Sequence, residues 1–330
     1  MSTTLDSEPR AETEPASEPP ATEQPTTAQA TTVAERLQAE TTAVRLRIRW
    51  PGVRKTLSQD QTRLAAGTFD ADIKSVSASK KLLDTSHPAF RAATAVKTQA
   101  IDFWKRSTLP YIEPGVRLLR RQEIGAFDMQ LTSVQAELAD AVEQLEQHYG
   151  ELVEQARQRL GNLFDAGDYA ANLRELFAIE WDYPSSDPPA YLLQVSPQLY
   201  YSECARVQTR FDEAVKLAEQ TFAEELSQLV SHLAERLQGD DGQPKVFRDS
   251  AVTNLLEFFD RFQRLNIRSD EQLDRLVAEA RQVIGGKAPQ QLREQPSLRQ
   301  NLTQELTRVE AALEGWLVDR PRRNLQRRPR

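Results

Sequence analysis

The stretch from Ile124 to Leu160 has the strongest periodic pattern in this chain, and it limits what the chain can fold into. Apolar residues recur along it at alternating spacings of three and four, with one heptad series formed by Ile124, Leu131, Leu138, Leu145 and Leu152. This spacing places one apolar stripe along a single helix, about 55 Å long at the helical rise of about 1.5 Å per residue. A stripe of that length needs a long partner to cover it, so the sequence predicts a mainly α-helical protein.

A second long amphipathic helix is predicted from Leu199 to Leu237, where Gly239 and Gly242 follow its last apolar residue. The insert between the two helices, residues 161–197, is expected to be a small α/β element. It would hold a short helix near residues 169–176 and strands near residues 177–183 and 191–195, on either side of a Pro-rich turn. Two long helices flanking an insert favour an antiparallel coiled-coil hairpin over residues 122–238, with the insert at its tip. The alternative is a bundle in which both helices pack among the others.

The two ends of the chain differ from its middle. Residues 1–40 are rich in Thr, Pro and Glu and have few apolar side chains, so they are expected to form a disordered acidic tail. Residues 244–319 are predicted to form further helices, one of which would begin with a capping box of Ser269 and Gln272. Residues 320–330 are rich in arginine and are expected to form a basic flexible tail.

Residues 41–121 are expected to form an α/β segment. Val44, Leu46, Ile48 and Trp50 alternate with arginines, a period of two that predicts a strand. Helices are predicted from Ser58 to Gly67, where Ser58 and Gln61 fit a capping box, and then over residues 70–83 and 88–108. Residues 116–119 are candidates for a second short strand.

Composition excludes several classes of site and of location. A single cysteine, Cys204, rules out an intrachain disulfide and a zinc site built on several cysteines, and it lies on a helix stripe where a core role is expected. No apolar run is long enough to span a bilayer and no signal-peptide pattern is present, so a cytoplasmic protein without membrane contact is expected.

The sequence contains no recognisable catalytic motif, whether a phosphate loop, a dinucleotide fingerprint, a zinc-protease helix or a nucleophile elbow. Of the three histidines, His148 and His232 would lie about 30 Å apart in the hairpin, because helical rise sets their separation. We therefore predict no catalytic residue, no metal ligand and no cofactor.

Two groups of residues are candidates for contacts with partners. Trp181, Asp182 and Tyr183 lie beside the Pro-rich turn, a composition typical of protein recognition as well as of a small packed core. The arginines of the first strand and the C-terminal tail could bind nucleic acid or an acidic protein surface; they are Arg45, Arg47, Arg49, Arg320, Arg322, Arg323, Arg327, Arg328 and Arg330. A net charge of -7 argues against the whole protein being a nucleic-acid coat.

Four segments resemble a family of uncharacterised bacterial and phage proteins: VRLRIRWPGVRK, SASKKLLDTSHPAFRAATAVKTQAIDFW, TLPYIEPGVRLLRR and FAIEWDYP. Members of that family are often encoded beside MoxR-type AAA+ ATPases and von Willebrand factor A proteins. The resemblance includes no catalytic motif and transfers no functional residue, and it implies an accessory role.

Together these features favour a non-enzymatic helical scaffold or adaptor that acts through protein–protein contacts, with a homo-oligomer as one form it could take. The alternative is a nucleic-acid-associated protein that uses the arginine-rich strand and tail. An enzyme would need a bound metal or cofactor, which elemental analysis and an absorbance scan would detect.

Overall fold

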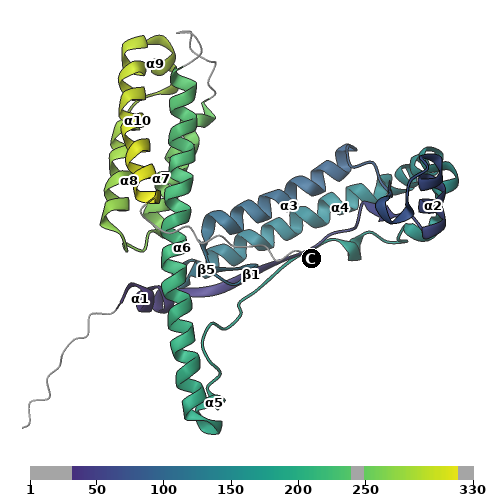
Figure 1. Ribbon diagram of the computed structural model, residues 1–330, viewed down its shortest axis with the longest axis horizontal. Helices are drawn as coiled ribbons and strands as arrows, with labels where there is room; N and C mark the ends of the chain where they lie inside the picture. The colour runs from purple at the N-terminus through teal and green to yellow at the C-terminus, as the bar shows by residue number, and fades with distance from the viewer. Residues whose placement is uncertain (1–31, 239–248, 319–330) are drawn as a thin grey trace, which may run out of the picture. The chain divides into compact units, whose positions relative to one another are not determined.

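Helices make up most of the computed structural model, which describes residues 32–238 and 249–318 (Figure 1). The prediction of a mainly α-helical protein is confirmed. The helices are α1 (Val33–Glu40), α2 (Gln59–Thr68), α3 (Pro88–Ser107), α4 (Ile124–Leu160), α5 (Tyr191–Val195), α6 (Pro197–Gln238), α7 (Ser250–Leu265), α8 (Glu271–Ile284), α9 (Pro289–Glu294) and α10 (Pro296–Val318).

Short strands form two antiparallel sheets. The larger has the order β4-β5-β1-β6, from β4 (Leu109–Pro110), β5 (Val116–Arg120), β1 (Thr41–Arg49) and β6 (Ala178–Asp182). The smaller pairs β2 (Arg54–Thr56) with β3 (Ser79–Lys81). In β1 the predicted alternation places Val44 in the core while Arg45, Arg47 and Arg49 are opposite Asp182, Glu180 and Ala178 of β6. The expected strands at residues 44–50, 116–119 and 177–183 are therefore present.

Helix α4 lies along α3, not along α6 (Figure 1). Its buried Val134, Leu138 and Leu145 belong to the same apolar cluster as Phe90 and Ala93 of α3. At the start of α4, Phe127 stacks on Phe103 of α3 with ring centroids 5.3 Å apart. Strand β6 and the turn η5 (Arg174–Leu176) also pack against α4 and cover more of its stripe.

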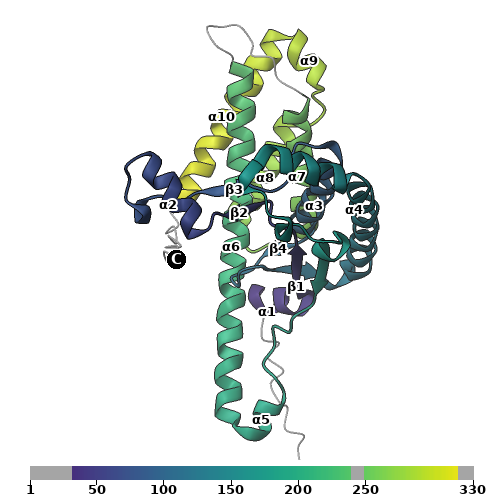
Figure 2. The same ribbon diagram turned by 90° about the vertical axis from the view of Figure 1, so that its right-hand side faces the viewer.

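Helix α6 has a different set of partners, chiefly α10, with α1 and α7 beside it (Figure 2). Phe222 of α6 meets Phe262 of α7 edge to face at 5.1 Å, and Phe258 lies next to both. Leu226 and Leu233 of α6 are buried in the same cluster as Leu306 and Leu313 of α10.

The described residues thus do not show the antiparallel hairpin predicted for residues 122–238. Each long helix is covered by shorter elements instead: α4 by a helix of 20 residues, and α6 by one of 23 residues together with α7. An apolar stripe specifies that a helix face must be buried, but not by which partner or by how many. The assumption that a long stripe needs one equally long partner was wrong.

Several local predictions also need correction. Residues 70–83 form no α-helix; they contain the three-residue 3-10 helix η1 (Ile73–Ser75) and β3. Residues 191–195 form α5 in place of the expected strand, and residues 169–176 contain only the turn η5 in place of a helix. Asp270, not Ser269, caps α8 by accepting a hydrogen bond from the Leu273 amide at 2.8 Å. The capping box of Ser58 and Gln61 is present in α2.

The expected acidic tail, residues 1–40, includes one helix among the described residues. Thr32 caps α1 through a capping box with Glu35. Ala34 and Leu37 of α1 are buried in the same apolar cluster as the core residues of α6. The remainder of that tail and the basic tail of residues 320–330 lie outside the described residues. Within 32–238 and 249–318, none of the helices combines the length and the apolarity that crossing a membrane requires.

Candidate functional site

The arginines of β1 lie beside carboxylates of the neighbouring strand. Arg45 donates to Asp182 through Nε at 3.2 Å and through Nη2 at 3.0 Å, and Arg47 Nη2 reaches the same carboxylate at 3.2 Å. Arg49 Nη2 pairs with Glu180 Oε1 at 3.4 Å. The antiparallel register puts acids opposite bases, so cross-strand attraction stabilises this edge of the sheet. These arginines are therefore largely neutralised within the chain, and their binding to nucleic acid stays an untested prediction.

Two of the three residues singled out for protein contact, Trp181 and Tyr183, converge on one carboxylate of α4. Trp181 donates its indole N–H to Asp128 Oδ1 at 2.6 Å, and the Tyr183 hydroxyl donates to the same oxygen at 2.7 Å. Burial of the ring, together with the adjacent negative charge of Asp128, raises the pKa of Tyr183 well above its ordinary value. This arrangement anchors β6 on α4 and gives Trp181 and Tyr183 a structural role.

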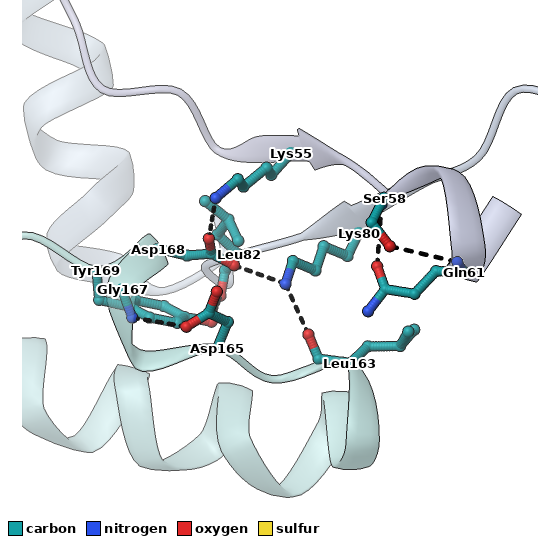
Figure 3. A network of polar contacts seen from close by, with 10 residues as sticks. All are labelled: Lys55, Ser58, Gln61, Lys80, Leu82, Leu163, Asp165, Gly167, Asp168 and Tyr169. Atoms are coloured by element: carbon teal, nitrogen blue, oxygen red, sulfur yellow. Dashed lines mark hydrogen bonds and ion pairs between the residues drawn. The ribbon is translucent and has the colours of Figure 1, made fainter.

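A buried ion cluster joins the small β2–β3 sheet to the turns that follow α4 (Figure 3). Lys80 Nζ lies 2.6 Å from Asp168 Oδ2 and donates to the Leu163 carbonyl oxygen at 2.7 Å, and Lys55 contacts Asp168 Oδ1. The side chain of Asp168 is inaccessible to solvent and that of Lys80 is 6% exposed. Hydrogen bonds from Lys55 and then Lys80 lower the pKa of Asp168, and the bond to Asp168 raises the pKa of Lys55.

The one carboxylate of this cluster, Asp168, is shared by the two ammonium groups of Lys55 and Lys80. A carboxylate held between two ammonium groups is a weak general base, because both neighbours stabilise its ionised form. The cluster therefore holds the small β2–β3 sheet in place and offers no acid–base pair for catalysis. Sequence reasoning missed it, since Lys80 and Asp168 are distant in the chain and residues 70–83 were expected to be helical.

The region from α5 into the first turns of α6 carries the densest group of exposed large apolar side chains. The exposed fraction is 63% for Tyr191, 44% for Leu193, 76% for Val195, 46% for Leu199 and 65% for Tyr201. We call these five residues the α5–α6 apolar patch. No charged residue occurs between Pro188 and Ser202.

Local sequence explains how the α5–α6 apolar patch forms. Pro197 opens α6, where its missing N–H costs nothing, and the Ser196 carbonyl oxygen accepts from the Tyr200 amide at 3.1 Å. Helix α5 packs on α6 (Figure 2), and the five side chains of the patch on these two helices are exposed. At the edge of the patch, a hydrogen bond with Cys204 raises the pKa of Tyr200. The sign of this patch in the sequence is its uncharged run, of which residues 191–195 were predicted as a strand and Leu199 as the start of the second long helix.

No group of three or more His, Cys, Asp or Glu side chains arranged to hold a metal occurs in residues 32–238 and 249–318. The nearest approach to one is an unexpected pair of histidines, His87 and His148, whose ring centroids lie 5.2 Å apart. His87 Nδ1 accepts a hydrogen bond from the Ala89 amide at 3.3 Å and so caps α3. His148 Nδ1 lies 3.7 Å from Glu151. The pair places the N-cap residue of α3 beside the interior of α4, and no third ligand accompanies it among the described residues.

Searches for relatives of known function found none: no family model matches the chain, and neither a curated protein nor a solved structure does. The resemblance to the family encoded beside AAA+ ATPases therefore depends only on the four quoted segments.

Proposed function

We propose that the protein is a non-enzymatic helical scaffold or adaptor, and that the α5–α6 apolar patch is its main protein-binding surface. The observation that carries this proposal is the clustering of Tyr191, Leu193, Val195, Leu199 and Tyr201, each more than two-fifths exposed, on one uncharged segment. Single exposed apolar residues are ordinary, but contiguous ones mark interaction sites.

The chemistry of the patch defines the partner. Aromatic residues are enriched and charges depleted in the cores of protein interfaces, and tyrosine is common among residues that dominate binding energy. The matching surface would be apolar and would contain few charges. The four resembling segments support an accessory role in an AAA+ ATPase system as the setting for that contact.

Site-specific photocrosslinking in the native cell tests this proposal. A photoreactive amino acid at Val195 should give a discrete crosslinked product, while the same group at Leu64, which is 75% exposed on α2, should not. The mass of the product distinguishes a second copy of the chain from a different protein.

The variant Leu193→Asp should abolish the product, because a charge in an apolar interface loses its hydration without gaining a partner. The matched control Leu64→Asp should leave it unchanged. Equal products from positions 195 and 64, or a product that survives Leu193→Asp, would contradict the proposal.

A further inference from the structure

A cavity of about 340 Å³ lies where the end of α3 meets β4, β5, α6 and α7. Its lining contains four cationic side chains, Lys105, Arg106, Arg117 and Arg261, against the two carboxylates of Asp102 and Glu225. The lining therefore holds two more positive than negative side chains. Ala218, Phe222 and Leu265 supply apolar walls.

Arg117 of β5 is the central cation. It donates through Nε to Thr108 Oγ1 at 2.7 Å, and through Nη2 to the carbonyl oxygens of Thr108 at 2.8 Å and Lys105 at 3.4 Å. These bonds stabilise the carboxyl end of α3, where a positive charge is favourable. Among the described residues, Nη1 of Arg117 has no hydrogen-bond partner and its guanidinium has no carboxylate within ion-pair distance.

Arg117 remains charged despite its surroundings. Burial, and to a lesser extent the charge of Arg261, lowers the pKa of Arg117 to about 10, still well above neutrality. A partly buried cation without a counter-charge is costly, and an anion bound beside it would recover that cost.

The other cations differ in how far they are already paired. Arg261 contacts Glu225, and Arg106 Nη1 lies 3.3 Å from Glu257 on α7. Lys105 is an exposed residue of the cavity lining and forms no ion pair within the described part of the chain. Helix capping thus accounts for two of the nitrogens of Arg117, but not for its free Nη1 or for the unpaired Lys105.

We propose that this cavity binds a small anion of the phosphate class, held by Arg117 Nη1 and Lys105. Guanidinium and ammonium groups are the usual protein partners of phosphate oxygens. The volume admits inorganic phosphate or a small phosphate ester. A phosphate of a nucleic-acid backbone has the same chemistry, so the test separates the two sources.

The experiment measures the affinity of the full chain for inorganic phosphate by calorimetry at constant ionic strength, with chloride as the balancing salt. Saturable binding with a stoichiometry of one is expected. Lys105→Gln should weaken it about tenfold, which is about 1.4 kcal/mol, because the phosphate would lose one charged hydrogen-bond donor. Lys105→Gln leaves the cap of α3 intact, since that cap uses only the backbone carbonyl of residue 105.

Lys74→Gln is the matched control, because Lys74 is exposed and lies outside the cavity lining. It should leave the affinity for phosphate unchanged. A single-stranded DNA oligonucleotide forms the second arm of the experiment. Absence of saturable phosphate binding, equal weakening by both variants, or binding of the oligonucleotide alone would each overturn the proposal. The photocrosslinking result does not depend on any of these outcomes.

Discussion

Single residues in this protein are held by polar contacts between distant parts of the chain. Asp168, in the turns after α4, contacts two lysines of the small β2–β3 sheet. Asp128 of α4 accepts hydrogen bonds from Trp181 of β6 and from Tyr183 in the loop after it. Each carboxylate satisfies two donors, so removing either leaves more than one group without its partner.

Asp168→Asn should destabilise the protein at neutral pH, because the buried Lys80 would keep its charge and lose its counter-charge. The folded-state pKa of Asp168 is lowered, so its carboxylate stabilises the fold above the unfolded pKa of about 3.8, and this contribution is lost as pH falls through the folded value. The difference in unfolding free energy between wild type and Asp168→Asn should therefore shrink in acid. Urea denaturation at pH 7 and near pH 3 measures it.

Asp140→Asn is the control for that measurement, since Asp140 is exposed on α4. Its free energy of unfolding should match that of the wild type at both pH values. A difference for Asp168→Asn that is equally large in acid would contradict the role assigned to the carboxylate.

Asp128→Ala should lower the free energy of unfolding by about 2 kcal/mol, because the Trp181 N–H and the Tyr183 hydroxyl would lose a charged acceptor. Met129→Ala, a change at the adjacent but 72% exposed position, should have little effect. Thermal or chemical denaturation of both variants checks this. Equal losses for the two would show that Asp128 has no special role.

At the scale of elements, the assignment of partners to the two long helices decides the architecture. Helix α4 packs on α3, while α6 packs on α10 and α7. Leu145 and Leu226 are both inaccessible to solvent, yet they belong to different apolar clusters. This division distinguishes the observed fold from a hairpin of α4 and α6.

Leu145→Ala and Leu226→Ala should each cost about 3 kcal/mol, as large-to-small changes in a packed core do. Hydrogen exchange should locate the two losses in different places: faster exchange in α3 for Leu145→Ala and in α10 for Leu226→Ala. In a hairpin, Leu145→Ala would instead raise exchange in α6.

At the scale of the molecule, the buried apolar residues separate into a large cluster around α6, a second one around α3 and α4, and a small third one of Val44, Leu119, Phe127 and Leu131. The α5–α6 apolar patch belongs to none of these clusters, and it contains several of the most exposed large apolar side chains. Its side chains therefore contribute little to the packed core, and a partner can reach them.

A double variant, Tyr191→Ser with Val195→Ser, should leave the free energy of unfolding within about 0.5 kcal/mol of the wild type, as exposed substitutions usually do. In this double variant, a photoreactive amino acid placed at position 199 should no longer give the crosslinked product. A large loss of stability would place these residues in the core and remove the basis for the proposed function.

The sequence by itself determined the elements with strong local causes. The heptad series from Ile124 predicted the extent of α4, the alternation from Val44 to Ile48 predicted β1, and Ser58 with Gln61 predicted the start of α2. The predictions were wrong where the local pattern was weak or fitted two kinds of element. The uncharged run around Tyr191 fits a strand or a helix, and the residues before Lys80 resemble an α-helix that does not form.

Only the tertiary structure decided which faces meet. An apolar stripe records that a face is buried without recording its partner, so α3 and α10 could not be identified as the partners of α4 and α6. The meeting of Lys80 with Asp168, and of Arg117 with the end of α3 in a cationic cavity, depends on the path of the chain through space. An ion pair between distant residues produces no periodic pattern in the sequence, because it involves only one residue in each of the two segments.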